Sequence, residues 1–171
     1  MKNIEKSNQS VEFRIEKLEG RHRKIFAAVQ ISRSLDQVWQ VITDYETFPD
    51  FMPIVSMSNR LVLPDGSICL EQHRTKKFMG LNIVARSVFK INEVYQRTVD
   101  YVLVEGDFLV FNSQWCIEPC EKAARLPCVN LTWRISVLPK KIYPVSLIEN
   151  VLKQDIPASL AAIRERVETL F

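Results

Sequence analysis

Residues 146–171, with the sequence SLIENVLKQDIPASLAAIRERVETLF, decide the fold class of this 171-residue chain. Apolar residues recur there at steps of three and four, the spacing of one helical face: Ile148, Val151, Leu152, Ile156, Leu160, Ile163, Val167 and Leu170. One amphipathic helix after a long strand-rich segment needs an apolar surface, which the inner face of a curved antiparallel sheet provides. Such a sheet often leaves a cavity beneath the helix, so the pattern favours a container for a small apolar molecule over a reaction.

The start and the middle of this helix carry separate signals. Ser146 and Glu149 are spaced as a capping box, which satisfies two backbone N–H groups, and Pro144 lies just before it. Pro157 removes one backbone hydrogen bond and clashes with the preceding turn, so we expect a kink near residues 153–155. The alternative is two shorter helices with a break between them.

Composition and charge are those of an ordinary globular protein. The chain is 47% hydrophobic and 25% charged, with a net charge of +3. Its length fits one domain, which we expect to span residues 11–171 after a flexible N-terminus at residues 1–10. The basic residues are scattered, so no nucleic-acid partner is predicted. Two short basic clusters are interpreted as solvated faces: Arg21, Arg23, Lys24 and Arg74, Lys76, Lys77.

Targeting signals and cysteine usage point to the cytoplasm. No apolar run is long enough to span a membrane, and the start MKNIEKSNQS lacks the apolar core of a secretory signal. The cysteines lack the paired spacing of a zinc site, so no metal is predicted. They are Cys69, Cys116, Cys120 and Cys128. Buried free thiols are expected, and a disulfide between Cys120 and Cys128 is the alternative.

The rest of the chain is predicted to hold strands and two short helical segments. Alternating residues 11–15 and 25–31 favour two strands. Ser34 and Gln37 form a second capping box, which begins a helix. That helix must end by about residues 44–47, because Phe48 precedes Pro49 and helical geometry is disfavoured there. The segment FPDFMP that follows is interpreted as a compact or helical turn. Further strands are predicted at residues 58–63, 67–76, 82–94, 98–104, 108–117 and 129–137.

This order predicts an α+β fold, because strands group together and helices are segregated to one side. Three segments then resemble the START-like superfamily, in its polyketide cyclase/dehydrase and coenzyme Q-binding branch, with a cyanobacterial or plastid-like character. They are ISRSLDQVWQVITDYETFPDFMP, EGDFLVFNSQWCIEP and SLIENVLKQDIPASLAAIRERVE. The resemblance covers about residues 22–170. It implies a helix-grip fold, in which a curved antiparallel sheet of about six to seven strands wraps around the C-terminal helix, with two short helices after the first long strand.

The sequence offers no catalytic constellation. Phosphate-binding glycine loops, G-x-S-x-G and H-E-x-x-H are all absent. His73 is a candidate polar anchor or base if it faces a cavity, although a rim or surface position is favoured for it. Arg86, Asp44 and Tyr45 are interpreted as surface or capping residues. We therefore predict no catalytic residue and no cofactor.

Residues of the apolar strand faces and of the terminal helix are candidates for a cavity lining. Aromatic stripes at strand spacing usually form core, so about half of the candidates are expected to do so. Ser113, beside Asn112 in an apolar strand, is small enough to leave room for a ligand. The candidates are Phe48, Phe51, Met52, Phe89, Phe111, Ser113, Trp115, Trp133, Val151, Leu152 and Ile156.

Three functions remain open from the sequence. The first is a carrier, sensor or chaperone that binds a hydrophobic small molecule such as a lipid, isoprenoid or quinone, with transient membrane contact. The second is a cyclase or dehydrase that acts on an apolar polyketide-like substrate. The third is an interaction or assembly factor whose exposed FPDFMP segment touches a protein partner.

Overall fold

The computed structural model describes residues 10–121 and 126–171. An eight-stranded antiparallel sheet has the order β1-β2-β8-β7-β6-β5-β4-β3. Its strands are β1 (Glu12–Lys17), β2 (Arg23–Ile31), β3 (Val55–Val62), β4 (Ile68–Phe78), β5 (Leu81–Val94), β6 (Thr98–Gly106), β7 (Phe108–Pro119) and β8 (Val129–Pro139). This is the expected α+β helix-grip fold. Its eight strands each overlap a strand predicted from the sequence, whereas the family resemblance implies about six to seven. The predicted flexible N-terminus, apart from Ser10, lies outside the described residues.

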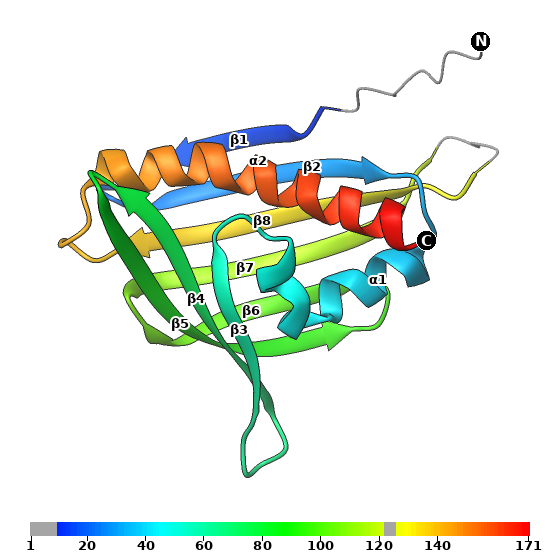
Figure 1. Cartoon of the computed structure of the whole chain (residues 1–171), viewed down its shortest axis with the longest axis horizontal. Helices are drawn as coiled ribbons and strands as arrows, with labels where there is room; N and C mark the ends of the chain where they lie inside the picture. Colours follow the sequence, from blue (N-terminus) through cyan, green and yellow to red (C-terminus); the bar gives the residue numbers. More distant parts are fainter. Residues whose placement is uncertain (1–9, 122–125) are drawn as a thin grey trace.

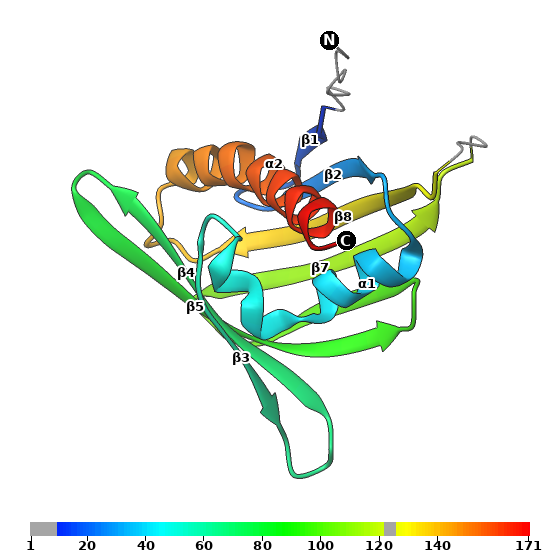
Figure 2. The same ribbon diagram turned by 45° about the vertical axis from the view of Figure 1, so that its right-hand side comes forward.

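The sheet curves around the long helix α2 (Val145–Leu170), which lies across its inner face (Figures 1 and 2). Helix α1 (Leu35–Thr43) and the 3-10 helix η1 (Tyr45–Asp50) follow β2 and cover the other end of that face. The alternation of apolar and polar residues in β8 places its apolar side chains in the core, because every second residue from Val129 to Val137 is buried. Within the described ranges, no helix combines the length and the apolarity needed to cross a membrane.

The two predicted capping boxes have different outcomes. Ser34 caps α1 as predicted, since its side chain accepts from the Gln37 N–H and the Gln37 side chain accepts from the Ser34 N–H. The prediction of a capping box at Ser146 is wrong, because α2 begins at Val145 and its N-cap residue is Pro144. Glu149 is bound instead by the guanidinium of Arg23, at 2.9 Å.

Helix α2 is one continuous helix, so the alternative of two shorter helices is wrong. Pro157 lies inside it, and two residues later the Ser159 hydroxyl donates to the Asp155 carbonyl at 2.7 Å. One position of the predicted apolar face, Leu170 at the end of the helix, is exposed.

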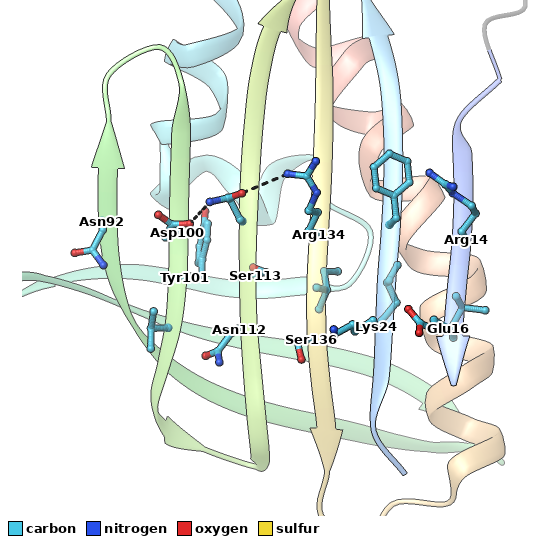
Figure 3. Close-up of a pocket in the computed structure, with 16 residues that line it drawn as sticks. Arg14, Glu16, Lys24, Asn92, Asp100, Tyr101, Asn112, Ser113, Arg134 and Ser136 are labelled. Atoms are coloured by element: carbon cyan, nitrogen blue, oxygen red, sulfur yellow. Dashed lines mark hydrogen bonds between the residues drawn. The ribbon is translucent and has the colours of Figure 1, made fainter. Parts of the chain in front are cut away.

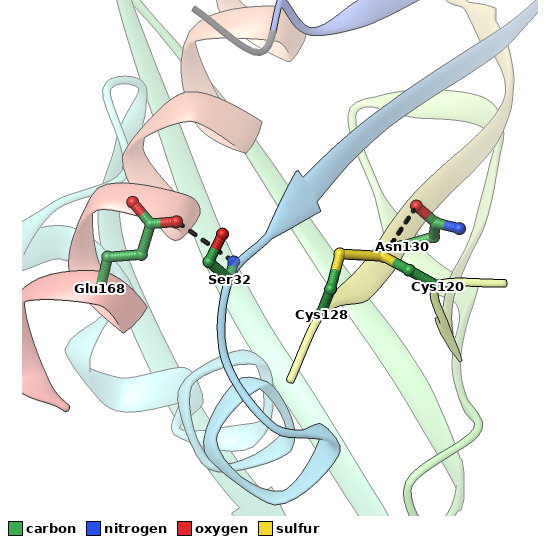
Figure 4. The surroundings of a disulfide bond; sticks show 5 residues. All are labelled: Ser32, Cys120, Cys128, Asn130 and Glu168. Carbon is green, nitrogen blue, oxygen red and sulfur yellow. Dashed lines mark hydrogen bonds between the residues drawn. A yellow bond between two sulfur atoms is a disulfide. The ribbon is translucent and has the colours of Figure 1, made fainter. Parts of the chain in front are cut away.

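A disulfide joins Cys120 and Cys128 at the end of the β7–β8 hairpin (Figure 4). The Cys120 N–H also donates to the Cys128 carbonyl at 2.9 Å, so strand pairing holds the two residues together. The expectation that all four thiols are free is therefore wrong for this pair. Cys69 and Cys116 remain free, and Cys69 is buried.

We predict that the denatured, unreduced protein carries two alkylatable thiols, Cys69 and Cys116, by intact mass after treatment with iodoacetamide. Reduction should lower the free energy of unfolding by about 2–3 kcal/mol, because the bond closes a short loop that would be unconstrained in the unfolded chain. A Cys120→Ser/Cys128→Ser variant is the control, since its stability should not respond to reductant. Four reactive thiols before reduction would contradict the disulfide.

Candidate ligand-binding cavity

A cavity of about 70 Å³ lies between the inner face of the sheet and the first half of α2. Its walls include Phe48, Met52, Phe111, Ser113, Trp115, Trp133, Val151, Leu152 and Ile156 from the predicted set. A second hollow of about 70 Å³ adjoins it toward the β4–β5 hairpin. Five residues border both spaces: Ile54, Arg74, Phe108, Ile148 and Val151.

Two predicted aromatic residues do not border the cavity. Phe89 is fully buried in the core, with its ring 5.3 Å from that of Phe111. Phe51 is partly buried outside the cavity, where its ring packs edge-on against Phe48 and lies 5.6 Å from the guanidinium carbon of Arg166. The structure therefore divides the aromatic candidates between core and wall.

Arg74 brings a positive charge to the cavity wall. Its Nη2 donates to the Oε1 of Gln72 at 2.8 Å, while its buried Nη1 has no hydrogen-bond partner among the described residues. Its guanidinium carbon lies 5.0 Å from the ring centre of Phe111 and 5.5 Å from that of Phe89. Burial lowers the pKa of Arg74 to about 10, so the side chain is still charged at neutral pH. No carboxylate within the described ranges forms an ion pair with it.

Two further polar atoms at the cavity are buried without a hydrogen-bond partner of normal geometry in the described part of the chain. They are the hydroxyl of Tyr101 and the indole Nε1 of Trp133. Burial raises the pKa of Tyr101, which therefore stays protonated. The Trp133 ring stacks on Trp115 at 4.2 Å, which fixes its orientation. Because an unmade buried hydrogen bond costs about 1–3 kcal/mol, these groups favour a ligand oxygen that accepts from them.

His73 does not border the cavity, which agrees with the rim or surface position that the sequence favours for it and leaves the alternative role of polar anchor without support. Residues of a strand alternate between its two faces, and on β4 the residues Leu70, Gln72 and Arg74 face inward. His73 therefore points outward, with its Nε2 3.5 Å from Glu71, and does not border the cavity.

Sequence reasoning missed the cavity side chains of Gln72, Arg74 and Tyr101. The interpretation of Arg74 as part of a solvated cluster is wrong. The two-residue spacing of the strand could have placed Arg74 correctly, because Gln72 and Arg74 follow Leu70 at intervals of two residues. The apolar Leu70 is fully buried, and that places its two polar successors on the same inner face.

A larger hollow, of about 1120 Å³, lies on the opposite, outer face of the sheet (Figure 3). Three of its polar side chains are bonded to one another: Gln114 donates to Asp100 at 2.7 Å, and Arg134 donates to Gln114 at 3.5 Å. His22 and Ser136 pair at 2.7 Å. This open surface already satisfies these groups, whereas the inner cavity holds buried donors without acceptors, so we assign the candidate site to the inner cavity.

Solved structures with this fold support the same architecture. A START superfamily protein from Mycobacterium smegmatis is 18% identical, with a TM-score of 0.69 over 86% of this chain and 99% of the other. The Zhui aromatase/cyclase from Streptomyces sp. R1128 is 15% identical, with a TM-score of 0.68 over 86% and 94%. A STAR-related lipid transfer protein fragment from Xanthomonas axonopodis is 20% identical, with a TM-score of 0.70 over 93% and 94%.

No curated protein sequence matches the chain. A family model described as polyketide cyclase / dehydrase and lipid transport matches residues 31–164, which is most of the chain and includes the cavity walls from Phe48 to Ser159. The chain belongs to the polyketide cyclase/dehydrase and lipid transport family.

Proposed function

We propose that the protein binds a hydrophobic small molecule that carries an anionic or strongly accepting oxygen, and that it acts as a carrier, sensor or chaperone for it. Long-chain acids and oxygenated isoprenoids or quinones meet this description. The observation that carries the proposal is the Arg74 guanidinium, which lies at an aromatic and aliphatic wall with its buried Nη1 unpartnered within the described residues. Apolar walls with a few convergent polar groups are the usual composition of a small-molecule site.

The arrangement supports one orientation of the ligand. Its oxygen would accept from Arg74 and Tyr101, whose side chains both border the first cavity. Its apolar part would extend past Phe108 and Ile148 into the second hollow, which Arg74 also borders. A charge buried without its counter-ion is costly, so an anionic ligand would recover interaction energy that the free protein lacks.

Ligand entry requires the cavity to widen. A volume of about 70 Å³ holds about two water molecules, whereas ligand sites commonly measure about 300 Å³ or more. Phe108 and Ile148 are only partly buried and border both hollows, so an outward movement of these side chains would join the two spaces.

The two alternative functions receive less support from the cavity. Arg74 is charged at neutral pH and the raised pKa of Tyr101 keeps its proton, so both side chains suit the ordering of a ligand better than the abstraction of a proton. The proposed protein-binding segment FPDFMP does not expose its apolar side chains, because Phe48 and Met52 are buried and Phe51 is partly buried.

Replacing Arg74 should separate binding from stability. For the wild type, we expect a fluorescent polyene fatty acid to bind at least tenfold more tightly than its methyl ester, and Arg74→Met should bring this ratio close to one. The same substitution should raise the free energy of unfolding by about 1–3 kcal/mol, because it removes a buried charge without a counter-ion.

The matched control is Arg86→Met, on the outer side of the neighbouring strand, where the arginine pairs with Glu71 and Glu105. It should leave the acid-to-ester ratio unchanged and have little effect on stability, because exposed ion pairs contribute little. Equal binding of acid and ester by the wild type, or a ratio that survives Arg74→Met, would refute the role of the guanidinium.

Filling the cavity should abolish binding without loss of the fold. Ser113 borders the cavity between Phe111 and Trp115, so Ser113→Phe should occupy the space and lower stability by about 1–3 kcal/mol. Native mass spectrometry with organic extraction should then find the ligand on the wild type and not on the variant. Asn112→Phe, on the exposed face of the same strand, is the control and should retain the ligand. Retention by Ser113→Phe would place the ligand elsewhere.

A further inference from the structure

The β4–β5 hairpin extends past its neighbouring strands at the end of the sheet that holds the second hollow. The pairing of β3 with β4 reaches only Arg74, and the pairing of β6 with β5 begins only at Ser87. The part of the hairpin beyond these residues is a two-stranded ribbon, and its tip projects past the rest of the sheet (Figure 2). Met79 and Gly80 form its turn, both with positive φ, which gives the tight turn of a two-residue hairpin loop.

The tip of this ribbon exposes apolar side chains. Met79 is 86% exposed and Leu81 is 71% exposed. Ile142 is 76% exposed. The connection between β8 and α2, to which it belongs, lies at the same end of the molecule as the hairpin turn in both views (Figures 1 and 2). A short two-stranded ribbon has little intrinsic stability, so large apolar groups at its tip favour a role in contact with something outside the chain.

The charge beside these apolar residues is positive. Lys77 and Lys141 are exposed, and neither forms an ion pair with a described residue. We call Lys77, Met79, Leu81, Lys141 and Ile142 the hairpin-end surface. Carboxylates near it are already engaged within the protein: Asp155 by Lys76 at 2.8 Å, Glu105 by Arg86 at 2.7 Å, and Asp107 by the backbone N–H of Arg86 at 2.7 Å.

This surface adjoins the second hollow. The arms of the ribbon supply one wall of that hollow through Lys76, Ile83 and Ala85. Tyr143, the residue after Ile142, lies on the other wall and stacks on Phe108 at 6.4 Å. A partner that contacts the hairpin-end surface would therefore lie next to the side chains that separate the two hollows.

We propose that the hairpin-end surface docks on the surface of an anionic lipid bilayer. Met79, Leu81 and Ile142 enter the boundary between headgroups and acyl chains, and Lys77 and Lys141 pair with anionic headgroups. The combination of separate exposed apolar side chains and unpaired lysines fits the boundary region of an anionic bilayer. A second copy of the chain is a less suitable partner, because its lysines would face the same lysines of the first copy. The docking is independent of which molecule occupies the cavity.

Vesicle flotation of the full chain tests this proposal, with phosphatidylcholine vesicles compared with vesicles that also contain phosphatidylglycerol. The wild type should bind the anionic vesicles and lose binding as salt rises. Lys77→Gln/Lys141→Gln should weaken binding about 25-fold, which corresponds to about fivefold for each lysine. Met79→Ser/Leu81→Ser/Ile142→Ser should weaken it at least tenfold, through the loss of inserted apolar surface.

The matched control is Leu61→Ser/Val62→Ser, which removes exposed apolar residues from β3, where that strand enters the β3–β4 hairpin. It should bind as the wild type does. The proposal is overturned if the wild type does not bind anionic vesicles, if it binds neutral vesicles equally well, or if the control loses as much binding as the triple variant. It is also overturned if the triple variant changes only the oligomeric state. Ligand extraction from the cavity is measured separately, so failure of docking leaves that result intact.

Discussion

The packing of α2 against the inner face of the sheet determines both the core and the cavity. In the second half of the helix, Leu160, Ile163 and Val167 are fully buried. In the first half, the helix is held by charged contacts, in which Arg23 binds Glu149 and Lys76 binds Asp155. These contacts hold the helix in place from its sides. Arg74 and aromatic side chains line the space between the helix and the sheet.

The presence of Arg74 at the wall is the reason to regard that space as a candidate binding site and not only as a packing defect. An apolar gap of this size would cost stability and favour no particular occupant. A guanidinium without a counter-ion adds a preference for an oxyanion, and the neighbouring Tyr101 hydroxyl adds a second donor at the same wall. The free protein is therefore less stable than its packing allows, which is a common cost of a preorganised binding site.

Much of the fold could be predicted from the sequence, because hydrophobic spacing follows backbone geometry. The terminal helix, the meander of strands and the capping box at Ser34 all follow from local patterns. The site was harder to predict. On β4 both faces carry polar residues, so the spacing of Arg74 from Leu70 is the one sequence cue that Arg74 rather than His73 faces inward. The Cys120–Cys128 bond depends on a hairpin that brings the two residues together, and the width of the cavity depends on side-chain packing.

The central claim is that the Arg74 guanidinium binds the anionic group of a ligand. The NMR signals of this side chain test the claim most directly. In a protein labelled with ¹⁵N-arginine, the Arg74 resonances can be assigned by their loss in Arg74→Met. Addition of a long-chain fatty acid should move the guanidinium N–H resonances downfield, as expected for a new charge-assisted hydrogen bond, while the methyl ester should not. Unchanged Arg74 signals at saturating fatty acid, or the same shift with the ester, would contradict the account.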